Sequence, residues 1–177
     1  MPLDQSKLET DLTLWLANKE LYATPLDSAN VFAQAYISYA KDAIDFTGDQ
    51  ILDTPGEDNV ASTLAGNLGL PGIAITAANG FTSAIQAFWT GATFTTGIPP
   101  ATMSAETSSV VSVIPTGLST AILAATFLAL NTSATDASKA TEIAAALHSD
   151  TLTVMVTITG TSNVFPFPTI QATGGIS

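Results

Sequence analysis

Charge is distributed very unevenly along this chain, and this pattern constrains its fold more than any other feature. Residues 1–58 hold eleven of the fifteen acidic residues and three of the four lysines. Between residues 59 and 135 the only charged side chain is Glu106, and residues 151–177 carry none. Thr, Ser, Ala and Gly fill these two neutral stretches. The pattern predicts an acidic, solvated front and a remainder whose surfaces have little charge.

Two interpretations of the neutral stretches are open. In the first, they form an amphipathic domain whose exposed faces use Thr and Ser in place of charge. In the second, they contact other protein chains, because the cores of protein interfaces are depleted of charged residues. Only 11% of the residues are charged and 46% are apolar, so the chain has little charge with which to cover a lone surface. We favour the second interpretation.

The missing residue types exclude several functions. The four basic residues are all lysines, and the formal net charge is −11. Nucleic-acid binding depends on Lys and Arg to neutralise phosphates, so we expect no nucleic-acid partner. Cysteine is absent and His148 is the single histidine, which leaves too few ligands for a structural zinc or iron site. We also expect no cofactor.

Membrane insertion and secretion are not expected either. The longest strongly apolar run is ten residues, 121–130, whereas a helix that crosses a bilayer needs about 20. The start at Met1 lacks a basic segment followed by an apolar run, so no signal peptide is predicted.

The spacing of apolar residues predicts a mostly helical chain. Ser6 and Glu9 have the spacing of a capping box, and Pro25 followed by Asp27 or Ser28 indicates a second helix start. The expected helices are roughly 5–21, from about 27 to near 48, 59–68 (the weakest), 73–89, 118–130 and 136–148. An exposed acidic connection is expected over 49–58, and a loop over 90–104.

One segment has the alternation of a strand. In Thr151–Thr159 the residues Leu152, Val154, Val156 and Ile158 would face a core, while the threonines would face outward. No charge protects the edge of this strand, so we expect a partner strand to cover it. A second short strand is predicted over 108–114. The prolines after Val164 favour an extended C-terminal tail.

The predicted fold class is therefore α+β, with about five helices, a small β element that includes strand 151–159, and an extended tail. We interpret residues 1–177 as a single domain in three parts. These are an acidic helical front (1–58), a neutral Ala/Thr-rich helical body (59–150), and the strand with the tail (151–177).

The sequence does not point to an enzyme. A catalytic serine would need His148 as its base, yet Ser149 and Asp150 are only sequence neighbours, whereas triad members usually converge from separate positions. His148 instead falls in the last turn of a predicted helix, where a cation suits the helix dipole. The acids of segment 42–58 have no calcium-loop spacing, so we interpret them as a solvated face, with calcium binding left open.

Aromatic and apolar residues near the neutral stretches are the candidates for contact with partners. Phe88, Trp89 and Phe94, followed by Ile98, form a cluster that suits a docking surface, a loop anchored on the core, or a small-molecule pocket. The full set of interface candidates is Phe88, Trp89, Phe94, Ile98, Val154, Val156, Thr157, Phe165 and Phe167.

The order of features resembles small virion proteins of tailed bacteriophages. An acidic helical start is followed by an Ala-rich middle that ends in Ile-Gln-Ala-Phe-Trp-Thr-Gly at 85–91 and by Gly-Ile-Pro-Pro at 97–100. Ala/Thr helices, a Thr/Val strand and a Gly-Gly tail come after it. The resemblance implies a non-enzymatic part of the head surface, neck, tail or baseplate. It carries over no functional residue.

The expected function is therefore a structural subunit of a multi-copy assembly, most simply a tailed-phage virion component. Its partners would be other copies of itself and other virion proteins. It would be made in the host cytoplasm and located in the virion. The alternative is a module that binds a carbohydrate or a host-surface ligand through Trp89 and nearby loops.

Overall fold

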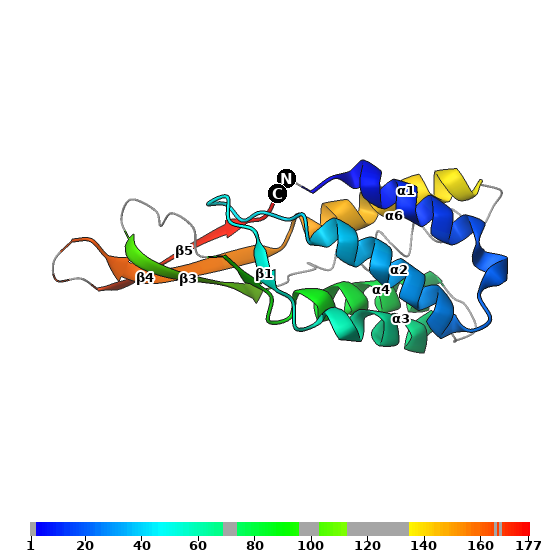
Figure 1. The fold of residues 1–177 in the computed structure, drawn as a ribbon, viewed down its shortest axis with the longest axis horizontal. Coiled ribbons are helices and arrows are strands. Elements are labelled where there is room, and N and C mark those ends of the chain that lie inside the picture. The colour runs from blue at the N-terminus through cyan, green and yellow to red at the C-terminus, as the bar shows by residue number, and fades with distance from the viewer. Residues whose placement is uncertain (1–2, 69–73, 96–102, 113–134, 165, 167) are drawn as a thin grey trace.

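A body of helices with a narrow β-sheet projecting from one end makes up the molecule (Figure 1). The computed structural model describes residues 3–68, 74–95, 103–112, 135–164, 166 and 168–177. These residues form the helices α1 (Gln5–Ala17), α2 (Pro25–Ala40), α3 (Val60–Leu68), α4 (Ala74–Trp89) and α6 (Asp136–Thr151), the short 3-10 helices η1 (Lys19–Leu21) and η2 (Glu57–Asn59), and the strands β1 (Ile51–Asp53), β2 (Thr93–Phe94), β3 (Met103–Ser112), β4 (Met155–Ser162) and β5 (Thr169–Gly175). The predicted α+β, mostly helical class is confirmed.

Two helix starts are capped by residues just upstream of those predicted. The side chain of Asp4 caps α1 and accepts the Ser6 N–H at 2.9 Å, so Ser6 is not the cap. Thr24 caps α2, and its hydroxyl and the Asp27 carboxylate form a reciprocal capping box with Pro25 at the first helical position. Thr135 caps α6, and its side chain accepts the Ser138 N–H at 3.2 Å.

Helix α2 is shorter than predicted. It ends at Ala40 instead of near residue 48. Asp45 directs the chain after it into a tight turn by accepting hydrogen bonds from Thr47 N at 2.8 Å and Asp49 N at 3.0 Å. Short acidic side chains that bond nearby backbone groups compete with helix formation in this way.

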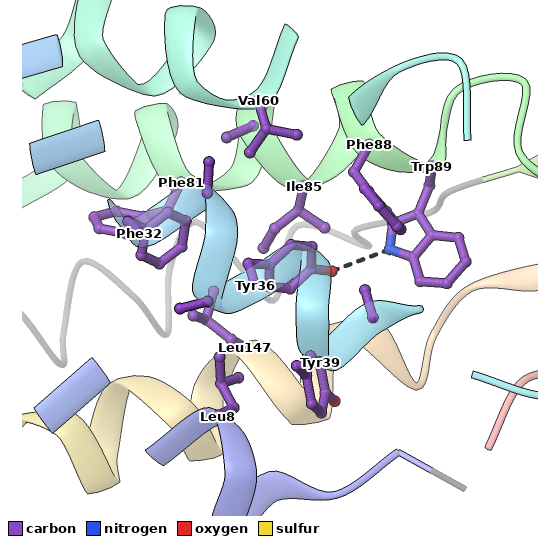
Figure 2. Packing of buried hydrophobic residues seen from close by; sticks show 14 of the residues in the cluster. Leu8, Phe32, Tyr36, Tyr39, Val60, Phe81, Ile85, Phe88, Trp89 and Leu147 are labelled. Atoms are coloured by element: carbon purple, nitrogen blue, oxygen red, sulfur yellow. Dashed lines mark hydrogen bonds between the residues drawn. The ribbon is translucent and has the colours of Figure 1, made fainter. Parts of the chain in front are cut away.

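The core is built around α2. This helix packs against α1 and α3, α1 packs against α6, and α3 packs against α4. Phe32 of α2 meets Phe81 of α4 edge to face with ring centroids 4.6 Å apart, and Tyr36 meets Phe88 in the same way at 5.8 Å (Figure 2). Apart from Ile158, the buried apolar residues that the structure describes form one cluster that runs from Leu3 to Ile176.

Two glycines provide a matched test of how closely the turn before η2 approaches α4. A Cβ on Gly56 would lie 1.6 Å from the Ala87 carbonyl oxygen of α4, whereas one on Gly66 of α3 would meet nothing within 4 Å. We expect Gly56→Ala to lower the free energy of unfolding markedly, because backbone must move to admit the methyl group. Gly66→Ala should raise this free energy by about 0.5–1 kcal/mol. Urea denaturation of both variants checks the pair, and equal effects would contradict this packing.

The projecting sheet has the order β3-β4-β5, and all of its pairs are antiparallel. Strand β4 starts at Met155 instead of residue 151, because Thr151 and Leu152 still belong to the end of α6. Leu152 is therefore 42% exposed and does not face the core, while Val154, Val156 and Ile158 are buried as predicted. Strand β4 has a partner strand on each side, β3 and β5, and both belong to the same chain.

The other strands differ from the expected ones in extent. Strand β3 begins at Met103, well before residue 108, and β2 lies inside the stretch 90–104 that was predicted to be a loop. The predicted extended tail is extended over Thr169–Gly175, where it forms strand β5. The expected helix 118–130 lies outside the described residues.

Candidate functional site

The aromatic residues proposed for a docking surface or a pocket lie in the core of this chain. Trp89 and Phe88 are fully buried, and Phe94 is 1% exposed. All three pack where α4 and β2 meet the rest of the body, so this cluster is core and presents no surface to a partner. Val154 and Val156 are also fully buried, and Thr157 is 9% exposed. Ile98, Phe165 and Phe167 lie outside the described residues.

Trp89 is held by a buried chain of hydrogen bonds. Its Nε1 donates to the Tyr36 hydroxyl at 3.0 Å (Figure 2). That hydroxyl oxygen lies 2.9 Å from Thr151 Oγ1. The Thr151 hydroxyl donates to the Leu147 carbonyl at 2.7 Å, so Tyr36 is the donor toward Thr151. Burial raises the pKa of Tyr36 well above its ordinary value, which keeps this donor protonated. These hydrogen bonds hold α4 and α6 against α2.

His148 occupies the predicted place in the last turn of α6, but its side chain does not act as an exposed cation. Its Nδ1 lies 2.6 Å from the Tyr39 hydroxyl of α2. Burial lowers the pKa of His148 below its ordinary value, and the opposing effect of the Asp4 carboxylate is smaller. Because burial disfavours the cation, the neutral ring accepts the Tyr39 hydrogen bond.

This arrangement predicts a pH dependence. We expect the single histidine to titrate below its ordinary pKa of 6.5. As pH falls below that value the unfolded chain binds more protons than the folded one, so the free energy of unfolding should decrease through this window. NMR titration of the ring protons measures the pKa. His148→Gln should lose this part of the pH dependence, and a folded-state pKa above 6.5 would contradict the prediction.

The acidic segment is more ordered and more buried than predicted. Asp45 is 2% exposed and Asp49 is 8% exposed, and Gly48 between them has a φ of 93° that suits a tight turn. Strand β1 then pairs with β2, so residues 49–58 are not simply an exposed connection. The segment acts as a structural link between α2 and the α3–α4 pair.

A shallow surface depression of about 580 Å³ lies beside this segment and is lined by Lys41 and parts of 51–58. Lys41 Nζ contacts Glu57 Oε2 at 2.6 Å, and this ion pair holds the pKa of Glu57 below its ordinary value. In the part of the chain that the structure describes, no three acidic or histidine side chains gather as a metal site would require. The depression therefore shows no chemistry of its own.

The projecting sheet, β3 to β5, is the feature that most clearly suits an interaction, and we call it the β arm. The sequence predicted its central strand and, over 108–114, part of β3, whereas β5 was expected only as an extended tail. One of its faces carries hydroxyl and amide side chains. Thr157 Oγ1 lies 3.0 Å from Thr173 Oγ1, and Gln171 Nε2 donates to Thr159 Oγ1 at 3.3 Å. The buried side chains of Val156 and Ile158 mark the opposite face.

Charge separates the β arm from the helical body. Strands β4 and β5 carry no charged residue, and β3 carries only Glu106. Every lysine lies in or beside a helix of the body, as do nearly all of the acids. Within the described ranges, the ion pairs are Lys7–Asp42, Lys19–Asp136 and Lys41–Glu57, and they also lie in the body. The arm is thus a neutral extension of an acidic body.

Comparison of the chain with known protein families, with curated protein sequences and with solved structures gave no match. Within the described residues, no helix combines the length and the apolar character that a membrane crossing requires.

Proposed function

We propose that this chain is a non-enzymatic structural subunit of a multi-copy assembly, a component of a tailed-phage virion. The observation that carries the proposal is the neutral β arm that projects from the acidic helical body (Figure 1). A projecting sheet whose single charged residue is Glu106 exposes backbone and hydroxyl groups that another protein can cover. An arm of this kind reaches a neighbouring subunit while the charged body keeps its own solvent shell.

The buried aromatic cluster supports the same function indirectly. Trp89 and Tyr36 use their polar atoms on each other and on Thr151. Both rings therefore pack in the core of the body. Trp89 is then not available as the main residue of a ligand site, which weakens the alternative function. Contact with partners is left to the surface outside this core.

Quantitative mass spectrometry of gradient-purified particles tests the function. The chain should sediment with particles from a lysate in which it is made, in a fixed ratio to the main particle protein, and should remain after a high-salt wash. Salt should have little effect because the contacting arm is neutral. If the chain stays entirely at the top of the gradient as a free monomer, the proposed function is wrong.

A further inference from the structure

Within the described residues, the backbone groups along the outer edge of β5 have no strand partner, and the direction in which they point alternates along the strand. Ser162 N donates to the Pro168 carbonyl at 2.8 Å, next to the regular β4–β5 pairing from Thr161↔Thr169 inward. Because antiparallel strands alternate, the backbone groups of residues 168, 170, 172 and 174 point toward β4. Those of Thr169, Gln171 and Thr173 point away from the sheet.

An independent contact confirms this alternation. Ser177 lies an even number of residues from Gln171, so its backbone groups should point the same way. Its N–H donates to the Ile44 carbonyl at 2.9 Å, and its carbonyl accepts the Ile44 N–H at 3.1 Å. The outer edge of the C-terminal strand is therefore already paired at the end next to the body. Among the described residues, nothing pairs with the outward groups of Thr169, Gln171 and Thr173, and all three residues are exposed.

The edge lacks the features by which monomeric proteins block strand addition. Such edges usually carry a Lys, a Pro or a bulge. Thr169–Gly175 contains no charge and no proline, and its register with β4 is regular throughout. The two nearest prolines, Pro166 and Pro168, lie before the strand at the tip of the arm.

We propose that the outer edge of β5 pairs antiparallel with the same edge of a second copy of this chain. About a two-fold axis at Gln171, Thr169 of one copy faces Thr173 of the other, so the edge is complementary to itself. Because β5 runs from the tip of the arm back to the body, antiparallel pairing places the two bodies at opposite ends. Two chains of net charge −11 thus meet at their neutral arms with their acidic bodies apart.

This inference rests on the proposed multi-copy function only for the choice of partner. A three-residue strand contact is smaller than the roughly 1,000 Å² of a stable interface, so the free pair should be weak. Several such contacts in one particle would act together, which makes a weak pair sufficient there.

Sedimentation velocity of the isolated chain from about 10 μM to about 1 mM, a range suited to contacts below standard size, tests the pairing. The wild type should shift from monomer toward dimer with concentration. Gln171→Pro removes an outward N–H without breaking a β4 bond, and Gln171→Lys adds a charge to the edge. Both variants should stay monomeric over the range, whereas the control Asn30→Lys on the exposed side of α2 should associate like the wild type.

Disulfide formation between two copies gives a second measurement, because the chain has no cysteine and a single one can be introduced at a chosen position. Under mild oxidation Gln171→Cys should form a covalent dimer several-fold faster than Asn30→Cys. Circular dichroism and thermal melts establish that each variant is folded. A wild type that stays monomeric throughout, or a dimer that persists in both edge variants, overturns the pairing.

The two proposals fail separately. A monomeric chain that is present in many copies per particle would remove the β5 pairing and leave the structural function. A chain that dimerises through Gln171 but is absent from particles would remove the structural function and leave the β5 pairing.

Discussion

Val156→Asp is expected to lower the free energy of unfolding by several kcal/mol. Val156 is fully buried, lies on the central strand of the β arm and belongs to the main apolar cluster. An aspartate there places a carboxylate in the apolar cluster, and burial of a charge without a partner is among the largest single costs in a protein. Urea denaturation measures the loss.

The matched control is Val164→Asp, the same substitution at a valine that is 69% exposed. This variant should unfold within about 0.5 kcal/mol of the wild type, as surface substitutions usually do. Equal stability of the two variants would show that β4 does not face the core through Val156.

Trp89→Ala should cost about 3–5 kcal/mol, the range for removal of a large buried aromatic side chain. Trp89 is fully buried, its ring meets Phe88 edge to face at 5.0 Å, and its Nε1 donates to Tyr36. The variant loses this packing and also removes a donor from the Tyr36 hydroxyl.

Tyr36→Phe separates the hydrogen bond from the packing. It keeps the ring but leaves the Trp89 Nε1 without its acceptor, which should cost about 1–3 kcal/mol. Leu52→Ala, at a residue 67% exposed, is the control and should have little effect. If Trp89→Ala is as stable as this control, Trp89 lies at the surface and the ligand-binding alternative returns.

The helical body could largely be predicted from the sequence. Leu8, Leu12 and Trp15 have one-face spacing on α1, and Phe32, Tyr36 and Tyr39 have it on α2; all of them are buried. Periodicity identifies such faces because burial on one side of a helix requires it. The caps were harder to locate, since Asp4, Ser6, Thr24 and Asp27 are all suitable capping residues and only the geometry selects among them.

For the aromatic cluster the sequence left three alternatives open, and the burial of its residues favours the one in which they anchor on the core. Phe88, Trp89 and Phe94 lie next to small residues and glycines, which suits an interface as well as a tightly packed core. The choice depends on long-range partners such as Tyr36, 53 residues from Trp89 in sequence. No local pattern carries that information.

The signal for the β arm was present in part. Residues 169–173 alternate polar and small or apolar side chains, as do the threonines of β4, but the nearby prolines obscured a regular strand. The sequence cannot indicate which edge of a sheet is free, because that depends on the order β3-β4-β5.

The central claim is that the neutral β arm joins copies while the acidic body faces solvent. Backbone hydrogen exchange of the chain, free in dilute solution and in its assembled form, tests it most directly. The claim predicts added protection on assembly at the outward amides of Gln171 and Thr173, with α1 and α2 unchanged. Added protection confined to α1 and α2, with β5 exchanging as in the free chain, would contradict it.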